Sequence, residues 1–376
     1  MAPGRAIRPG ATLSGPMTAP RSDHRLLVDD FDYDLPAAAI AQVPAEPRDA
    51  SRLLVLDRAT SEPGRPALTH RTFRELGELL RPGDLLVVND SRVIPARLPA
   101  TRPGGAAAEI LLLRPMPDEP DRWEALVRPS RRVAAGSVLR LRGGDEVQVG
   151  ERLAEGTRAV RFDRDPYQVM AEAGETPLPP YITNRSAAAD RYQTVYADSL
   201  GSAAAPTAGL HFTPELLHSL ETSGVERAHV TLHVGLDTFR PLEGQFVDEH
   251  RIHREWYEIP AATLSAVART GRDGGRVVAV GTTSVRVLET AARDRLSAGW
   301  TDLYITPPYE FEAVDALITN FHLPRSSLLV LVGAFVQEGM HAATPLGARD
   351  TLVAAYRAAL EAGYRFFSFG DAMLIA

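Results

Sequence analysis

The chain has 376 residues, a net charge of −7, 44% hydrophobic residues and 24% charged residues. This is the composition of an ordinary globular protein, long enough for two domains with their own cores. The sequence has no Cys, and all 41 basic residues are Arg. Disulfide scaffolds, Cys-zinc sites, thiol nucleophiles, Schiff-base lysines and the P-loop lysine are therefore excluded. No apolar run approaches the roughly 20 residues that span a bilayer, so we expect a cytoplasmic protein without membrane contact.

The first 25 residues are rich in Pro and Arg and contain no apolar segment. We predict a disordered leader here, with Met17 as a possible alternative start. The pattern of apolar and polar residues in the rest of the chain predicts an α/β main domain that is interrupted by an inserted small β-barrel. The boundaries that we expect are 26–96 and 181–376 for the α/β main domain, and 97–180 for the barrel.

A buried strand is predicted at Leu85–Val88, where four apolar residues follow the turn Pro82-Gly83. The strand ends in a polar turn that contains Asn89, Asp90 and Arg92. Polar groups at the end of a buried strand are candidates for binding a ligand.

Short alternating runs follow between residues 97 and 180, separated by Gly, Pro and Asp. They predict five strands, at 109–113, 123–127, 137–141, 146–149 and 159–162. The same region is rich in Arg, including Arg128, Arg131 and Arg132. These side chains are candidates for contact with a phosphate backbone, although a run of charge is often only a solvated face.

Strands alternate with helices after residue 192. We predict strands at 228–234 and 277–280 and a third that closes at Ile305, with helices at 214–223, 285–296 and 348–362. Such alternation favours a largely parallel sheet in an α/β layer.

Two histidines lie at element ends in this half of the chain. His211 precedes a helix that Thr213 caps and Pro214 begins, close to N–H groups that favour an anion. His233 lies at the carboxyl end of the strand 228–234, where ligands of α/β sheets collect. The alternatives are that His211 caps a loop and that His233 faces solvent.

The segment 315–335 places Asn320 and His322 between two apolar runs. Buried polar groups need partners, because an unpaired one costs roughly 1–3 kcal/mol. A second polar turn, Thr282-Thr283-Ser284, follows the strand 277–280 and begins a helix, as an anion or ribose cradle would. Near the C-terminus, Gly370-Asp371 interrupts an apolar strand and brings in a carboxylate.

An acidic and imidazole cluster surrounds His250 and His253. A His-x-x-His pair is a weak metal signal without further ligands, and surface charge is the more common explanation. A metal hydrolase is accordingly the most distant of the functions considered.

Ten ordered segments, from Phe31 to the C-terminus, resemble the S-adenosylmethionine:tRNA ribosyltransferase-isomerase family of queuosine biosynthesis. They read FDYDLP, PAEPRDASRLLVLDR, RPGDLLVVNDSRVIPARL, PLPPYI, YQTVYA, APTAGLHF, VTLHVG, VAVGTTSVRVLE, DALITNFHLPRSSLLVLVGAF and YRFFSFGDAMLI. The fold implied by this resemblance is an α/β domain interrupted by a β-barrel.

The resemblance implies transfer of the ribosyl part of S-adenosylmethionine to 7-aminomethyl-7-deazaguanine at the tRNA wobble position. Isomerisation then gives epoxyqueuosine, with adenine and methionine released. S-adenosylmethionine is the co-substrate, tRNA is the partner, through its anticodon loop, and no metal is expected.

Residue roles are carried over only as hypotheses. One of His211, His233 and His322 is expected to be the base that removes a C5′ proton. Asp90 and Asp371 would hold the aminomethyl group, and Arg92 or Arg286 the methionine carboxylate. Further substrate contacts are expected from Asn89, Thr207, Gly209, Thr282, Thr283, Ser284 and Asn320.

Two positions depart from the family pattern. Asp237 stands where HVGAGTF has a Gly, and Pro308 stands where YPGY has one. Two alternatives therefore stay open: a paralogue that uses a free 7-deazapurine, and a tRNA-binding protein without catalysis.

Overall fold

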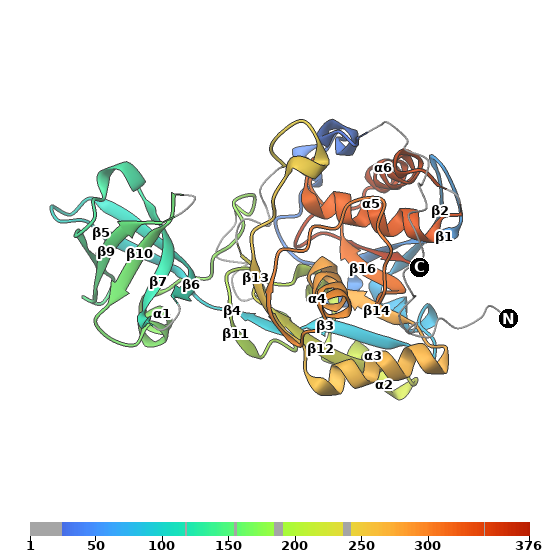
Figure 1. Ribbon diagram of the computed structural model, residues 1–376, viewed down its shortest axis with the longest axis horizontal. Helices are drawn as coiled ribbons and strands as arrows, with labels where there is room; N and C mark the ends of the chain where they lie inside the picture. Colours follow the sequence, from blue (N-terminus) through green and yellow to red (C-terminus); the bar gives the residue numbers. More distant parts are fainter. Residues whose placement is uncertain (1–24, 117–118, 154–155, 184–190, 236–241, 342) are drawn as a thin grey trace, which may run out of the picture.

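The computed structural model describes residues 25–116, 119–153, 156–183, 191–235, 242–341 and 343–376. The predicted leader lies outside these residues except at Arg25, as does Asp237. Figure 1 shows two bodies, a large α/β body and a small β-barrel set beside it. The α/β architecture with an inserted barrel, expected from the sequence, is confirmed.

The main body is built on a mixed sheet in which the described strands follow the order β15-β13-β12-β3-β14-β16-β17-β1-β2. Their bounds are β15 Ala298–Thr301, β13 Glu255–Glu258, β12 Glu226–Leu232, β3 Leu85–Asn89, β14 Val277–Val280, β16 Ala316–Asn320, β17 Ala372–Ile375, β1 Arg52–Glu62 and β2 Arg65–Thr72.

The central strands β12, β3, β14 and β16 run parallel to one another, and β1 and β17 form a second parallel pair; β13 and β15 pair antiparallel on one side. On the other side β17 is antiparallel to β16, and β2 is antiparallel to β1. Ile305 closes no strand, because the strand that precedes it, β15, ends at Thr301.

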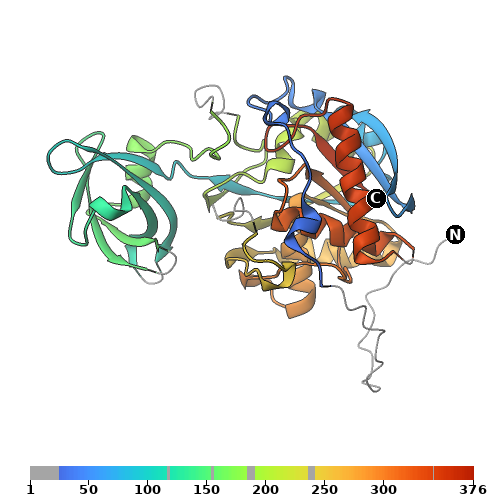
Figure 2. The same ribbon diagram turned by 90° about the horizontal axis from the view of Figure 1, so that it is seen from above.

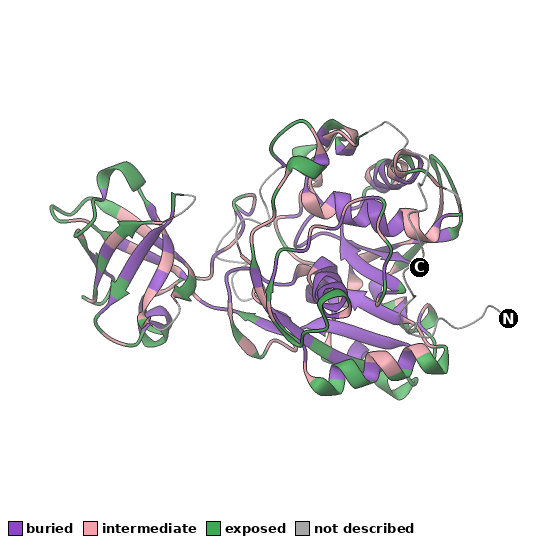
Figure 3. Cartoon of the chain, in the orientation of Figure 1, coloured by how far each residue is buried: buried purple, intermediate pink, exposed green. Residues whose placement is uncertain are grey.

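Alternating side chains of the sheet supply two cores. In β3, Leu85 and Val87 join one core and Leu86 and Val88 the other, as the period of two requires. The helices α3 Ala261–Asp273, α4 Gly281–Asp294, α5 Ser327–Gly339 and α6 Pro345–Glu361 pack into the first core, and α2 Pro214–Thr222 packs into the second. The sheet is therefore covered on both faces, and its strands β3, β14, β16 and β17 are buried along their whole length (Figure 3).

The barrel is closed in the order β10-β7-β6-β5-β8-β9. Its strands are β5 Arg97–Thr101, β6 Ala107–Met116, β7 Glu119–Arg128, β8 Val138–Leu141, β9 Glu146–Arg152 and β10 Arg158–Phe162, followed by helix α1 Pro166–Ala173. The five strands predicted from the sequence are present. The sixth, β5, was missed because Pro99 interrupts it and its apolar pattern is short.

The chain leaves the main body through β4 Ser91–Val93 and returns through β11 Ser199–Ser202, and these two strands pair with each other. Figure 2 shows the barrel standing apart from the main body. Arg114 of the barrel lies over the ring of Trp300 on β15, with 5.3 Å between the guanidinium carbon and the ring centroid. Among the described residues, no helix is long and apolar enough to cross a membrane.

Candidate active site

A pocket lies in the main body at the carboxyl ends of the parallel strands β14 and β16. Its wall is formed by the starts of α4 and α5, the 3-10 turn Thr207–His211, and loops that contribute Tyr181 and Phe367. The empty volume is about 660 Å³, including the open mouth. This is the edge at which α/β sheets collect their ligands.

The start of α4 forms one side of the pocket and offers unused hydrogen-bonding groups. The helix begins directly after β14 at Gly281, whose φ of +84° favours glycine. The residue before the helix, Val280, has no side chain that could cap it, and Ser284 Oγ donates back to the Val280 carbonyl at 2.8 Å. The buried Thr283 hydroxyl, beside Thr282 in the lining, has no hydrogen-bond partner among the described residues. A free helix N-terminus of this kind favours an anion.

The start of α5 is different, because its own side chain satisfies it. Ser326 accepts from the Leu329 N–H, and its hydroxyl donates to the Leu323 carbonyl at 2.7 Å. Of the two helix starts in the wall, that of α4 is therefore the one whose backbone N–H donors remain available to a ligand.

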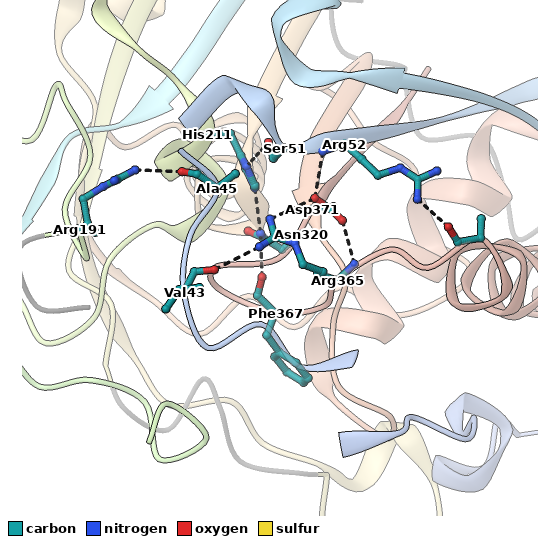
Figure 4. Close-up of polar contacts among 11 residues, drawn as sticks. Val43, Ala45, Ser51, Arg52, Arg191, His211, Asn320, Arg365, Phe367 and Asp371 are labelled. Atoms are coloured by element: carbon teal, nitrogen blue, oxygen red, sulfur yellow. Dashed lines mark hydrogen bonds and ion pairs between the residues drawn. The ribbon is translucent and has the colours of Figure 1, made fainter. Parts of the chain in front are cut away.

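His211 and Asn320, predicted from separate segments, meet in the structure (Figure 4). His211 Nδ1 lies 2.8 Å from Ser51 Oγ, and His211 Nε2 lies 3.2 Å from Asn320 Nδ2. Asn320 also bonds the Phe367 carbonyl and the Thr207 hydroxyl. Burial, together with the nearby charges of Arg365 and Arg48, lowers the pKa of His211 to about 3.

His322 lines the same pocket from the loop after β16. Its Nε2 lies 2.9 Å from Thr319 Oγ1, and its backbone is held by Tyr33, whose hydroxyl donates to the His322 carbonyl, and by Tyr356. Burial lowers the pKa of His322 to about 3, so the ring is neutral at physiological pH. A fixed, neutral imidazole can accept a proton.

His233 lies apart from this wall. Its ring stacks on Trp256 at 5.3 Å between centroids, and it packs so closely on Gly201 that a Cβ there would come within 2.8 Å. Burial lowers the pKa of His233, and the nearby Asp90 opposes that shift. In the part of the chain that the structure describes, the buried imidazole Nδ1 has no hydrogen-bond partner.

The polar turn after β3 mainly holds the sheet together. The Asn89 side chain exchanges two hydrogen bonds with the backbone of Leu232, both at 3.1 Å, and so continues the β3–β12 pairing. Asp90 accepts from Thr231 at 2.6 Å, whereas the Arg92 side chain is exposed on β4. None of these three lines the pocket.

Three other predicted residues are also engaged by the protein itself. Arg286 forms a buried ion pair with Glu255. The Asp371 carboxylate accepts from the backbone N–H groups of Arg52 and Arg365, at 2.9 and 2.8 Å. Gly209 gives room to Tyr196, whose hydroxyl would lie 2.0 Å from a Cβ. These contacts keep all three out of the pocket lining.

The pocket includes residues that sequence reasoning did not single out, namely Tyr181, Thr319, Phe367 and Ser368. The Tyr181 and Ser368 hydroxyls lie 2.6 Å apart and join the loop that returns from the barrel to the loop before β17. Ser51, the partner of His211, was also missed. All of these residues except Thr319 lie in loops or turns, where the sequence shows no hydrophobic periodicity. The signal that could have identified them is that they lie in the family-like segments PLPPYI, DASRLLVL and RFFSFGD.

In the barrel, six arginines hydrogen-bond a nearby carboxylate: Arg97, Arg114, Arg122, Arg140, Arg161 and Arg164. Arg128, Arg131 and Arg132 are exposed and form no ion pair in the described part of the chain. Arg131 and Arg132 lie in the turn Ser130–Arg132, and Arg128 precedes it. Beside this turn the buried Arg158 donates to the Val133 carbonyl at 3.2 Å. Among the described residues, this turn gathers three positive charges that no carboxylate compensates.

The two remaining sequence features lie outside the pocket. His250 packs against Tyr304, and the described residues contain no group of three or more His, Asp or Glu side chains that could hold a metal. Pro308 is exposed, on a loop that Glu289 anchors by accepting from the N–H groups of Glu312 and Ala313, each at 3.0 Å.

Comparison with known proteins identifies the family. Residues 28–375 match the family described as queuosine biosynthesis protein. An S-adenosylmethionine:tRNA ribosyltransferase-isomerase from Gloeobacter violaceus is 50% identical, covering 96% of this chain and 98% of the relative. One from Thermotoga maritima is also 50% identical, covering 93% of this chain and 99% of the relative.

A solved structure supports the same assignment. The crystal structure of S-adenosylmethionine tRNA ribosyltransferase from Thermotoga maritima superposes on this chain with a TM-score of 0.51 and 41% sequence identity. The match covers 92% of this chain and 100% of the Thermotoga maritima chain. The resemblance noted in the sequence is thereby confirmed. The chain belongs to the queuosine biosynthesis family that contains these S-adenosylmethionine:tRNA ribosyltransferase-isomerases.

Proposed function

We propose that this enzyme transfers the ribosyl part of S-adenosylmethionine to 7-aminomethyl-7-deazaguanine at the wobble position of tRNA and isomerises it. The products are epoxyqueuosine in the tRNA, free adenine and methionine. S-adenosylmethionine acts as co-substrate, and the reaction as written needs no metal or redox cofactor. Because both substrates are cytoplasmic, we assign the reaction to the cytoplasm.

The observation that carries the proposal is the uncapped start of α4 facing the same pocket as His322. S-adenosylmethionine carries a carboxylate and a reactive sulfonium on one molecule. The N–H groups at the start of α4, with the Thr282 and Thr283 hydroxyls, are suited to the carboxylate. This arrangement leaves the sulfonium end for the rest of the pocket.

Of the three histidines, we assign the base to His322. The sulfonium acidifies the adjacent C5′–H bond, and the proton passes from C5′ to the imidazole while the electron pair stays on C5′. Thr319 and the backbone contacts of Tyr33 and Tyr356 fix the ring in place. Proton transfer by a positioned side chain typically accelerates a reaction by roughly 10²–10⁴-fold.

We assign the tRNA backbone to the turn that carries Arg128, Arg131 and Arg132. Their guanidinium groups have no carboxylate partner in the described chain, unlike the six paired arginines of the barrel. Phosphate groups are the natural partners of exposed, unpaired Arg side chains. The barrel would then hold the tRNA while the main body performs the chemistry.

The direct test is adenine release from S-adenosylmethionine, measured with tRNA that carries 7-aminomethyl-7-deazaguanine and, separately, with the free base. Release with the tRNA alone, accompanied by a mass gain of the tRNA, is the expected result. Release with the free base alone would indicate a small-molecule acceptor, and no release with either would contradict catalysis.

A further inference from the structure

The side-chain amide of Asn320 has only one possible orientation. Its two ends face three groups: the Phe367 carbonyl and His211 Nε2, each at 3.2 Å, and Thr207 Oγ1 at 3.0 Å. A carbonyl oxygen can only accept, so the end that faces Phe367 must be the NH₂ group. The amide oxygen therefore faces Thr207. Figure 4 shows Asn320 between His211 and Phe367.

This orientation fixes the tautomer of His211. One hydrogen of the Asn320 NH₂ group points at Nε2, which must accept it and cannot carry a proton. A neutral imidazole then holds its proton on Nδ1, which donates to Ser51 Oγ at 2.8 Å. The ring is held by stacking on Phe73, with 5.0 Å between centroids. Its burial lowers the pKa to about 3 and so keeps it neutral.

The same orientation fixes the role of Thr207. Its one hydroxyl hydrogen is donated to Asn320 Oδ1, so the oxygen has only lone pairs left to offer. Thr207 lies in the lining of the pocket. Toward any ligand it can act only as an acceptor, close to the start of α4, whose backbone N–H groups are donors.

We propose that Ser51, His211 and Asn320 form a one-directional hydrogen-bond chain that presents Thr207 as an acceptor for an N–H or O–H group of the substrate. His211 is accordingly a positioning residue and not the base, because its Nε2 lone pair is already used. The inference rests on the proposed function only in naming S-adenosylmethionine as the ligand.

Kinetics of two His211 variants separate positioning from proton transfer. In His211→Gln the new carbonyl oxygen can still accept from Asn320, whereas His211→Leu offers nothing. We expect His211→Leu to raise the KM for S-adenosylmethionine about tenfold, the worth of roughly one hydrogen bond, with the turnover rate changed less than threefold. His211→Gln should lie between it and the wild type. If His211→Gln instead slowed turnover by about two orders of magnitude or more, the proposal would be overturned, since a base would be lost in both variants.

A double-mutant cycle tests the chain itself. Thr207→Val removes the acceptor, and in that background His211→Leu should raise the KM little further. If the two residues acted independently, the effect of His211→Leu would be the same in both backgrounds. Thr207→Ser keeps the hydroxyl and should recover most of the affinity lost in Thr207→Val. Full additivity, or no recovery by Ser, would contradict a chain that acts through Thr207.

The tautomer can be measured without any substrate. Nitrogen-15 NMR of the histidine ring, assigned by comparison with His211→Gln, should show the proton of His211 on Nδ1. A proton on Nε2 would overturn the proposal even if the enzyme is active. Conversely, a wild-type protein with the Nδ1 tautomer that neither binds nor cleaves S-adenosylmethionine would contradict the proposed function and leave the chain intact.

Discussion

The guanidinium of Arg286 on α4 and the carboxylate of Glu255 on β13 form an ion pair in which the side chains are only 5% and 6% exposed. Arg286 also donates to the Leu303 carbonyl, and Glu255 accepts from the Gly235 N–H at 2.9 Å. The pair ties α4 to the antiparallel edge of the sheet. Such a buried pair is costly to break, because the remaining partner keeps its charge without compensation.

We expect Arg286→Met to lower the free energy of unfolding by about 3–5 kcal/mol, the usual cost of leaving one buried charge unpaired. Adding Glu255→Gln should recover part of that loss, because the amide can still accept from Gly235. Chemical denaturation of the two variants measures both effects. A variant of unchanged stability with weakened S-adenosylmethionine binding would instead make Arg286 a substrate ligand.

The stability of the fold should depend on pH through His211 and His322. Both have a pKa of about 3 in the folded protein, below the ordinary value of 6.5. Between these values the unfolded chain binds more protons than the folded one, so stability falls as the pH falls from 6.5 toward 3. Each histidine contributes a slope of about 1.4 kcal/mol per pH unit.

Urea denaturation at pH 6, 5 and 4 measures this slope, and His211→Gln provides the comparison. In the variant, the slope of the unfolding free energy against pH should be smaller by the contribution of one histidine, about 1.4 kcal/mol per pH unit. An identical slope in the variant would mean that His211 is protonated in the folded state.

Binding of tRNA should depend on the turn at Arg128, Arg131 and Arg132. Each phosphate contact contributes about 0.7–0.9 to the slope of log affinity against log salt concentration. The triple Gln variant should therefore reduce that slope by about 2 and weaken tRNA binding without changing the affinity for S-adenosylmethionine.

Arg161 is the matched control for that experiment, because it lies on the same barrel but is paired with Asp121 at 2.7 Å. Arg161→Gln should leave the salt dependence close to that of the wild type. Equal effects of the control and the triple variant would show that the turn has no special part in tRNA binding.

The sequence was most informative where apolar periodicity and polar strand ends coincide. Strands β3 and β14 were predicted to within a residue because their apolar runs are continuous and bounded by polar turns. The same reasoning predicted Asn320, His322, Thr282 and Thr283, which do share one pocket. Their proximity follows from the common carboxyl edge of parallel strands.

Other features could not be predicted from local sequence. The sequence gives no sign that Arg286 and Asp371 are bound by the protein itself. The partner of Arg286 lies 31 residues away, and one partner of Asp371 is as distant in sequence as Arg52. Only the fold brings these groups together. His233 was favoured for its strand end, yet it packs on Trp256 of the neighbouring strand. The sheet was expected to be largely parallel, but antiparallel strands flank its parallel centre, and nothing in a short apolar run distinguishes the two.

The most direct test of the account is single-turnover adenine release by His322→Gln, with both substrates saturating. We predict a fall of about 10²–10⁴-fold, with the Kd for S-adenosylmethionine changed less than threefold and the fold intact by chemical denaturation. Wild-type release by this variant would contradict the assignment of the base and of the pocket in which the chemistry takes place.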